Sequence, residues 1–330
     1  MAKAKTISAH LSPATYRENI KKVPTRNGYG DGVVEAGEKN EKIVVLCCDL
    51  TESTRNKKFK ETFPDRFIQM GIAEQSLAGI AGGLALEGKI PFISSYAAFS
   101  PGRNWEQIRL VACIQNQNIK IIGAHAGVSV GPDGATHQML EDIAITRVLP
   151  NMTVLAPSDY LETKRAVLAA AELKGPVYIR FARSASPTFT TAKTPFKIGR
   201  AEILKDGSDV AIIGCGPLVH EALMAAKLLK EKGVDAMVVN SHTIKPLDHK
   251  TIAAVAKKCG AVVTVEEAQC TGGLGGAVAE SLAKNQPTPM RFIGVHDQFG
   301  TSGTPDELIK EFELDRTAIA KAALEVIELK

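Results

Sequence analysis

The sequence predicts an α/β protein built from two parallel-sheet domains, and three observations support that fold class. Short apolar runs alternate with helical patterns along most of the chain, an order typical of parallel strands connected by covering helices. Residues 184–195 lack periodicity and carry prolines and small polar residues, which indicates a linker. The length of 330 residues is sufficient for two domains.

The first series of elements precedes the linker. Its strands are expected at residues 43–48, 90–94, 119–124, 153–156 and 177–181, where apolar residues run together. Its helices are expected at residues 25–39, 74–86, 104–115, 138–148 and 159–173, with Ser158 as the N-cap of the last one. Trp105, Ile108 and Val111 recur at helical spacing, so we expect them in the core.

A second α/β series follows the linker. Its strands are expected at residues 210–213, 236–239, 261–265 and 291–295, and its helices at 218–231, 249–257, 274–283, 305–312 and 316–327. The domains are therefore predicted at residues 1–190 and 191–330, the second being the smaller.

The composition excludes several classes of protein. With 40 basic and 36 acidic residues the net charge is only +4, which argues against a nucleic-acid partner but allows a local basic patch for phosphorylated substrates. The six cysteines show no CxxC pair and no metal-ligand spacing, so we expect reduced, mostly buried thiols and no metal site. No apolar stretch approaches the ~20 residues of a membrane span, and no apolar region follows the N-terminal lysines. We expect a soluble, cytoplasmic protein without a membrane partner.

Residues 121–147 form the most informative stretch of the chain. They place His125, Asp133 and His137 around a loop with four glycines, after an apolar run and before a helical pattern. A polar, flexible loop at the exit of a strand usually builds a site. From the residues alone, ligation of a metal by these three side chains and a purely structural loop both stay open.

Several motifs occur together with this loop in a fixed order. They are PTRNGYG at residues 24–30, DLTES at 49–53, GIAEQ at 71–75, SYAAFSPGRNWEQIR at 95–109, GPDGATHQ at 131–138, EDIAITR at 141–147, SDYLETKRAV at 158–167 and GPVYIRFAR at 175–183. The chain thereby resembles the C-terminal half of transketolase, with a pyrimidine-binding domain followed by a transketolase C-terminal domain. Independent motifs in the correct order are far more specific than one pattern, although the second domain resembles the family more loosely.

The resemblance implies thiamine diphosphate as cofactor. The implied reaction moves a two-carbon glycolaldehyde unit from a ketose phosphate to an aldose phosphate, as in the pentose phosphate pathway. Glu74 would hydrogen-bond the far nitrogen of the aminopyrimidine ring, and burial among small residues could raise the pKa of its carboxyl. Phe99 would stack on that ring, Tyr96 would be a nearby wall, and Asp49 would support the cofactor site across a subunit interface.

The resemblance also implies the residues that handle substrate. His125 and His137 would be the catalytic histidines, and a near-neutral pKa would suit His125 for proton transfer to a sugar oxygen. Asp133 would hydrogen-bond a substrate hydroxyl and so read its stereochemistry.

A phosphate group would be bound by three further residues, Arg26, Ser53 and Arg183. The arginine side chain offers a planar fork to phosphate oxygens.

Half of the machinery of that family is missing from the sequence. A GDG…N motif, which binds the metal–diphosphate end of the cofactor, does not occur: Gly30-Asp31-Gly32 follows no apolar strand, and Asn56 comes too soon after it. Gly214-Cys215-Gly216 lacks the third glycine of a dinucleotide-binding turn and is interpreted as a tight strand-to-helix turn. We therefore expect an N-terminal-section partner subunit that holds most of the Mg²⁺ (or Ca²⁺) and diphosphate contacts, in an α2β2 heterotetramer.

Three rival functions are open at this point. The β subunit of a 2-oxoacid dehydrogenase has a similar size and the same architecture and missing half, and would decarboxylate a 2-oxoacid. A 1-deoxyxylulose-phosphate synthase-like carboligase shares elements of GIAEQ and GPDGATHQ and would use pyruvate as donor. A non-catalytic subunit could keep the fold, but Glu74, Phe99, His125, Asp133 and His137 are all retained. Glu266-Glu267 and residues 272–276 of the second domain are expected to shape an interface rather than to catalyse.

Overall fold

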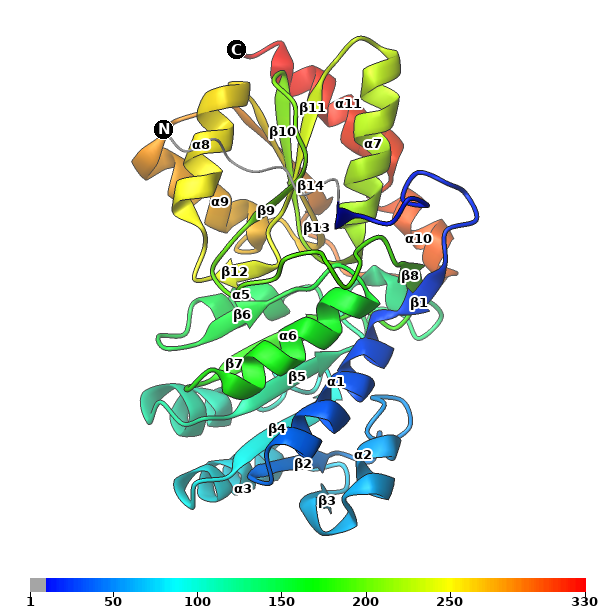
Figure 1. The fold of residues 1–330 in the computed structure, drawn as a ribbon. Coiled ribbons are helices and arrows are strands. Elements are labelled where there is room, and N and C mark those ends of the chain that lie inside the picture. Colours follow the sequence, from blue (N-terminus) through cyan, green and yellow to red (C-terminus); the bar gives the residue numbers. More distant parts are fainter. Residues whose placement is uncertain (1–9) are drawn as a thin grey trace.

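A computed structural model describes residues 10–330; residues 1–9, with the N-terminal lysines and the start of the first predicted domain, lie outside the described residues. Two α/β lobes are stacked end to end (Figure 1). The first contains a seven-stranded sheet of order β12-β6-β7-β5-β4-β2-β3, parallel except for β12. Its strands are β2 (Ile43–Cys47), β3 (Phe67–Gln69), β4 (Ile90–Tyr96), β5 (Lys120–Ala124), β6 (Thr153–Leu155), β7 (Val177–Phe181) and β12 (Thr243–Lys245).

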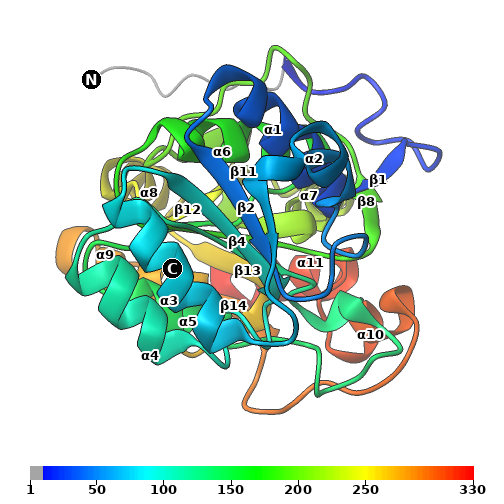
Figure 2. The same cartoon turned by 90° about the horizontal axis from the view of Figure 1, so that it is seen from below.

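Helices cover both faces of the first sheet, and every residue of β2, β5 and β7 is accordingly buried. One face carries α1 (Thr25–Lys39) and α6 (Tyr160–Glu172), with α2 (Lys57–Thr62) and the short η2 (Pro64–Arg66) nearby. The other carries α3 (Glu74–Leu86), α4 (Trp105–Gln107), the π-helix η3 (Ile108–Ile114) and α5 (Asp142–Arg147) (Figure 2). A Cβ atom on Gly28 would collide with the backbone oxygen of Tyr160, so glycine permits the close packing of α1 on α6.

The second lobe contains a five-stranded sheet of order β14-β13-β10-β11-β9, parallel except for β9. Its strands are β9 (Glu202–Lys205), β10 (Val210–Gly214), β11 (Ala236–Asn240), β13 (Val262–Gln269) and β14 (Met290–Val295). Helices α7 (Val219–Glu231) and α11 (Arg316–Ile327) cover one face, and α8 (His249–Cys259) and α9 (Leu274–Asn285) cover the other; η5 (Gly216–Leu218) and α10 (Pro305–Glu311) are short (Figure 1).

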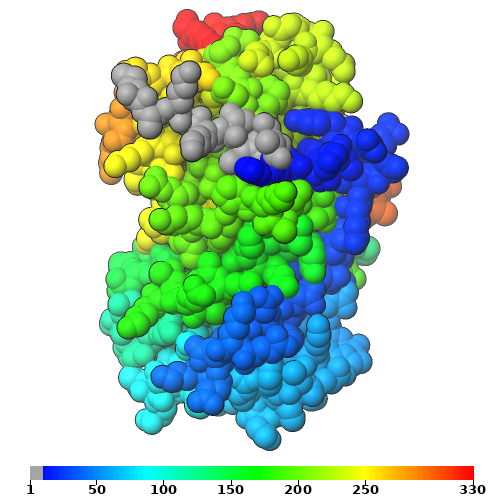
Figure 3. All heavy atoms as spheres, in the orientation of Figure 1, coloured from blue at the N-terminus to red at the C-terminus, as the bar shows by residue number. Residues whose placement is uncertain are grey.

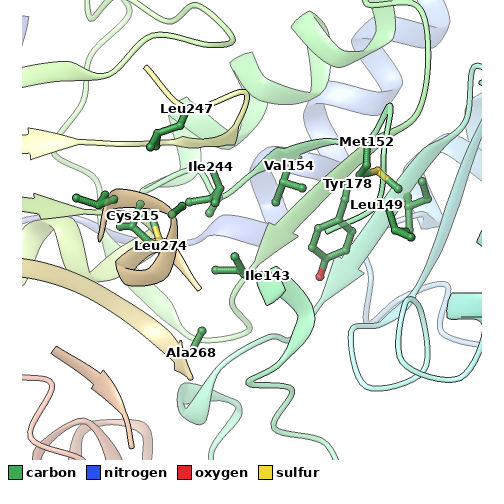
Figure 4. Packing of buried hydrophobic residues seen from close by; sticks show 14 of the residues in the cluster. Ile143, Leu149, Met152, Val154, Tyr178, Cys215, Ile244, Leu247, Ala268 and Leu274 are labelled. Carbon is green, nitrogen blue, oxygen red and sulfur yellow. The ribbon is translucent and has the colours of Figure 1, made fainter. Parts of the chain in front are cut away.

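The two lobes share structure at their junction. Strand β12 comes from the second half of the sequence but pairs with β6 of the first sheet. One buried apolar cluster runs through the junction, with Ile143, Val154 and Tyr178 on one side and Cys215 and Leu274 on the other (Figure 4). The lobes are therefore joined by a continuous core.

The described part of the N-terminal segment, residues 10–24, also connects the lobes. It lies against the second lobe and leads along the side of the molecule into α1 of the first (Figure 3). Strand β1 (Lys22–Pro24) in this segment pairs antiparallel with β8 (Ala185–Pro187). The hydroxyl of Thr191 donates to the backbone oxygen of His10, which fixes the segment to the chain that follows β8.

The predicted α/β class with two mainly parallel sheets is confirmed. All nine strands and all ten helices expected from the sequence occur, most within two residues of the expected ends. Trp105, Ile108 and Val111 pack on the core as expected, and of the six cysteines only Cys270 is partly exposed. No described helix is long and apolar enough to cross a bilayer.

Three details expected from the sequence were wrong. Ser158 is not the N-cap of α6; Asp159 caps it, because its carboxylate accepts from the backbone N–H of Glu162. The helix expected at 138–148 begins only at Asp142, since the Gln138 amide instead donates to three backbone oxygens, one of them that of Thr301 in the second lobe. Segment 184–195 is not a loose linker, because it contains β8 and the completely buried Phe189.

Candidate active site

The candidate residues gather at one edge of the first sheet. Strands β2, β4, β5 and β7 are parallel, so their carboxyl ends and the loops that follow them lie at the same edge. This edge is where ligands bind in such sheets. It presents Tyr96 at the end of β4, His125 after β5 and Arg183 after β7, while Arg26 enters from the first turn of α1.

His125 is completely buried and has a left-handed backbone, with φ of 57°. Burial, followed by the positive charges of Arg26, Arg183 and Arg55, lowers the pKa of its imidazole to about 3. The near-neutral pKa expected for His125 was therefore wrong, because the sequence does not show three arginines converging on one ring. At physiological pH the ring is neutral.

The tautomer of His125 follows from its neighbours. Its Nε2 lies 3.3 Å from the Nη1 of Arg26. A guanidinium can only donate, so Nε2 accepts and the proton of the neutral ring is on Nδ1. Nδ1 is buried without a hydrogen-bond partner among the described residues. His125 is thus prepared to donate a hydrogen bond to a ligand.

Arg26 connects the histidine to the DLTES loop. Its Nη1 donates to the backbone oxygen of Ser53 at 3.1 Å, and the Ser53 hydroxyl lies 2.7 Å from the Tyr96 hydroxyl. Burial and the neighbouring Arg55 and Arg183 lower the pKa of Arg26, yet it stays a cation. Three arginines from three segments thus share one positive region, which suits an anionic group.

Arg183 and Asp133 contact each other. The Nη1 of Arg183 donates to the backbone oxygen of Val130 at 3.0 Å and lies 3.3 Å from an Asp133 carboxylate oxygen. Both side chains are partly exposed, so the pair can open to receive a ligand. A phosphate would compete with the Asp133 carboxylate for the same guanidinium.

An aromatic cluster lies beside the histidine. Tyr96 contacts the His125 ring at 4.1 Å between centroids, and Phe99 stacks on Tyr96 at 6.1 Å. The ring of His137 meets the Phe99 ring edge-on at 5.4 Å. Tyr96, Phe99 and His137 are all half-buried, so their surfaces are available to a planar ligand.

Glu74 is the first residue of α3 and is only 2% exposed. One carboxylate oxygen accepts from the Ser95 hydroxyl at 3.0 Å, and the other lies 3.5 Å from the Nη1 of Arg103. The guanidinium of Arg103 also lies 5.1 Å from the centre of the Phe99 ring. Arg103 therefore links Glu74 to the aromatic cluster.

Of the predicted site residues, only Asp49 stands apart. It is exposed at the end of β2, with φ of 55°, and its carboxylate accepts from the side-chain amide of Gln69. Glu74, Tyr96, Phe99, His125, His137, Arg26, Ser53, Asp133 and Arg183 form one connected region.

Three contributors to this region could not be picked out in the sequence: Arg55, Ser95 and Arg103. Arg55 raises the positive charge beside Arg26 and has a left-handed backbone, with φ of 66°. Arg103 stands within the motif at residues 95–109, but no local pattern distinguishes it from a solvated arginine. Only the folded sheet shows that it reaches Glu74.

The two glycine patterns set aside in the sequence have structural roles. Asp31 of Gly30-Asp31-Gly32 lies inside α1, where its carboxylate accepts from the Tyr160 hydroxyl. Gly216 forms the turn between β10 and α7. Within residues 10–330, no group of three or more His, Cys, Asp or Glu side chains is placed to hold a metal ion.

The second lobe supports the loop that carries His125. Glu267 is buried, and its carboxylate accepts from the backbone N–H of Ser129 at 2.5 Å. A Cβ atom on Gly127 would collide with this carboxylate, and its φ of 91° is unfavourable for other residues. Glu266 caps the N-terminus of α9 by accepting from Leu274 and Gly275. Glu267 thus contributes to an interface between the lobes.

Comparison with protein families agrees with the order of the two lobes. Residues 21–188 match the model described as the transketolase pyrimidine-binding domain, and residues 199–319 match that described as the transketolase C-terminal domain. The matched residues include the whole connected region at the edge of the first sheet.

Individual relatives cover nearly the whole chain. A protein of Methanocaldococcus jannaschii, provisionally named a transketolase C-terminal section, is 47% identical over 91% of this chain and 95% of its own. The 6-deoxy-6-sulfo-D-fructose transketolase subunit of a Clostridium species is 40% identical over 92% of this chain and 95% of its own. Human transketolase is 39% identical over 91% of this chain, but only 48% of its own length is matched.

Among solved structures, one described as "Split gene transketolase, inactive beta4 tetramer" superposes with a TM-score of 0.88 and 45% sequence identity. The match covers 93% of this chain and 99% of that one.

Proposed function

Because the chain belongs to the transketolase family, we propose that it is the C-terminal subunit of a split transketolase. In this proposal it transfers a two-carbon glycolaldehyde unit from a ketose phosphate to an aldose phosphate with thiamine diphosphate, and only together with an N-terminal-section subunit. The observation that carries the proposal is the unbroken set of contacts from Glu74 through Arg103, Phe99 and Tyr96 to His125.

The residues present fit the pyrimidine end of the cofactor. Arg103 contacts both the buried carboxylate of Glu74 and the half-buried ring of Phe99. Together, Glu74 and Phe99 supply a hydrogen-bonding group and a stacking surface for an aromatic amine. Glu74, Phe99 and Tyr96 would hold this end, and Asp49 would support it from the neighbouring subunit. When bound, thiamine diphosphate supplies the carbon nucleophile that accepts and passes on the two-carbon unit.

The proposed role of His125 differs from general acid catalysis. Its ring is neutral and its Nδ1–H lacks a partner among the described residues, so it donates a hydrogen bond to a substrate oxygen and stabilises negative charge that develops there. His137, whose Nδ1 lies 2.9 Å from the Thr136 hydroxyl, would contact the reacting end of the sugar. Asp133 would accept from a substrate hydroxyl.

The anionic end of the substrate would lie against Arg26, Ser53 and Arg183. Formation of that complex moves Arg183 from the Asp133 carboxylate to the phosphate, which frees the carboxylate for a sugar hydroxyl. One relative is named for a sulfonated sugar, a different anion that the same arginines could bind. We propose phosphorylated sugars for this chain because a phosphate, with its charge of about −1.5 to −2, is attracted to the three neighbouring arginines more strongly than a singly charged sulfonate.

The proposed assembly is an α2β2 heterotetramer. Helix α3 begins at Glu74, and α3 and its neighbour η3 expose apolar side chains to solvent: Ile80, Leu86, Leu110 and Ile114. Gly79 and Gly83 on α3 have open space in front of them. Such a face suits pairing of two copies of this chain beside their cofactor sites. The partner subunit would bring the metal and the diphosphate contacts.

Reconstitution tests the proposal. The full chain is assayed for ketol transfer alone and with an N-terminal-section subunit bearing GDG…N, with thiamine diphosphate and Mg²⁺ present. We expect turnover only with both chains. The similar tetramer built from one kind of subunit alone is described as inactive. Robust turnover by the chain alone would contradict the split-enzyme proposal.

Two variants of the reconstituted enzyme test the assigned site. Glu74→Ala is expected to reduce kcat by about 10²–10⁴-fold without unfolding the chain, while Glu52→Gln, an exposed carboxylate paired only with Lys57 among the described residues, serves as the control. Full activity of Glu74→Ala would contradict the proposed role of Glu74 in binding the pyrimidine end of the cofactor. If pyruvate replaced the ketose phosphate as donor, a dehydrogenase or a deoxyxylulose-phosphate synthase-like function would be favoured.

A further inference from the structure

A cavity with a mixed polar and apolar lining lies at the junction of the two lobes, away from Glu74 and Phe99. It has a volume of about 290 Å³, is partly open to solvent, and is lined by the N-terminal segment, β8, η4 (Val128–Val130), α7 and α10. In Figure 1 these elements meet at the right-hand side of the molecule, around the labels β1, β8 and α10. The proposed catalytic role uses none of the cavity's polar side chains.

Three side chains that line this cavity each carry a buried polar atom without a hydrogen-bond partner among the described residues. These atoms are the Oγ atoms of Ser129 and Ser186 and the Nδ1 of His220. Each side chain is more than nine-tenths buried, and the three come from η4, β8 and α7. An unpaired buried polar group costs about 1–3 kcal/mol, so three such groups lining one cavity indicate a binding site for a polar molecule.

The protonation of His220 defines part of the ligand's chemistry. Its Nε2 lies 2.9 Å from the backbone oxygen of Thr15, and a carbonyl only accepts, so Nε2 carries a proton. Burial lowers the pKa of His220, which keeps the ring neutral. Nδ1 therefore keeps an unpaired lone pair, and a ligand that reaches it must donate a hydrogen bond. The two serine hydroxyls can donate or accept.

The charges around the cavity argue against a phosphate or another strong anion. Three cations, Arg17, Lys22 and Arg316, line the cavity together with four carboxyl groups, those of Glu18, Glu221, Glu267 and Asp306. Arg316 already pairs with Glu221 at 2.7 Å, and the Glu267 carboxyl accepts from the backbone N–H of Ser129. This arrangement differs from the three converging arginines of the candidate active site. Apolar side chains complete the wall: Ile20, Leu218, Met224 and Ile309. Such a lining suits a molecule with hydroxyl groups and C–H surfaces and no net charge.

We propose that this cavity binds a small uncharged polyol, of about three to five carbon atoms, as a ligand separate from the substrate. Its volume is at the lower limit of the roughly 300–1,000 Å³ typical of small-molecule sites. The polyol donates to His220 and exchanges hydrogen bonds with Ser129 and Ser186. Ser129 lies on the loop that also carries His125, so a ligand bound to Ser129 contacts that loop. The backbone N–H of Ser129 donates to Glu267 of the second lobe.

Binding is tested on the full chain labelled with [methyl-¹³C]methionine. Met224 lines the cavity, and Met224→Leu assigns its methyl signal. Glycerol, erythritol and xylitol are titrated as probes, and we expect a saturable shift of the Met224 signal with erythritol or xylitol and none at the distant Met70. The readout needs no turnover, so its outcome is independent of the proposed ketol transfer.

Variants decide where the polyol binds. Ser186→Leu fills the cavity and should abolish the shift, whereas Ser186→Ala removes one hydroxyl and should raise the Kd by about 2–10-fold. Ser208→Ala, an exposed serine in the turn before β10, should leave the Kd unchanged. A shift that never saturates, one that persists in Ser186→Leu, or no shift with any probe would overturn the proposal and mean that the cavity holds only water. If Ser186→Leu does not fold, Ser186→Ala decides.

Discussion

The buried ion pair between Arg180 and Asp142 offers the sharpest test of which contacts stabilise the junction of the lobes around the candidate site. Asp142 is completely buried, accepts from the Nε of Arg180 at 2.8 Å and accepts from the hydroxyl of Tyr178 at 2.7 Å. The Nη2 of Arg180 donates in turn to the backbone oxygen of Glu267 in the second lobe. One guanidinium therefore ties β7 to α5 and to β13, on either side of the loop with His125.

Asp142→Asn leaves the guanidinium of Arg180 buried without the carboxylate that it hydrogen-bonds, and with only the Glu267 carboxyl as a further counter-charge. Removing one partner of a buried pair costs about 3–5 kcal/mol, and Tyr178→Phe, which removes only one hydrogen bond to a charged group, should cost about 1.5–3 kcal/mol. At about 2 °C per kcal/mol for a large chain, Asp142→Asn should lower Tm by about 6–10 °C. Replacing both charges together, as Asp142→Leu with Arg180→Met, should be much less costly than either change alone.

The assay is urea unfolding of the full chain, followed by circular dichroism, together with Tm. The control is Glu280→Gln, which removes the exposed carboxylate that lies 2.7 Å from Arg147 and should cost no more than about 1 kcal/mol. If Asp142→Asn cost as little as this control, the pair would not stabilise the junction and the reasoning would be refuted.

Three further predictions concern the site and its assembly. His125→Asn should make the chain less sensitive to acid: the folded-state pKa of about 3 lies below the usual 6.5, so the unfolded chain binds the extra proton and stability falls as pH drops from 6.5 towards 3. The free energy of unfolding should therefore decrease between pH 7 and pH 5 by about 2 kcal/mol less in this variant than in the parent, and an equal decrease in both would contradict the burial of a neutral ring. Arg26→Met in the reconstituted enzyme should raise KM for a phosphorylated acceptor by roughly 10–100-fold, from the loss of one charge-assisted hydrogen bond of about 1.5–3 kcal/mol. KM for the unphosphorylated sugar should change little. Equal effects on both sugars would contradict a contact between Arg26 and the phosphate. Ile80→Asp, on the exposed face of α3, should reduce the mass of the assembly measured by light scattering, whereas an unchanged mass would exclude this face as the pairing surface.

The sequence predicts the order of the elements well because local patterns determine it. Alternating apolar runs and helical patterns locate the strands, and parallel strands place the loops after β4, β5 and β7 at one edge. This is enough to bring Tyr96, His125 and Arg183 together. The ends that were wrong depend on distant partners. Asp159, rather than Ser158, caps α6 while its carboxylate also accepts from Phe189 and Thr190 in a segment thirty residues later.

The electrostatic state of the site could not be predicted for the same reason. The pKa of His125 depends on burial and on arginines from three separate segments. The position of Arg103 beside Glu74 depends on the sheet having formed. Residue types indicate which chemistry is available, whereas the charge of each group is set by contacts that only the fold creates.

Strand β12 has a consequence for how such a chain can be divided. If the chain ended at the proposed domain boundary after residue 190, β6 would lose its neighbour Thr243–Lys245 and become a bare edge with unpaired backbone groups. Bare edges of this kind promote aggregation. A break between the two lobes would leave one product with an exposed, unpaired sheet edge. A chain of this architecture therefore tolerates division before the first lobe far better than division between the lobes.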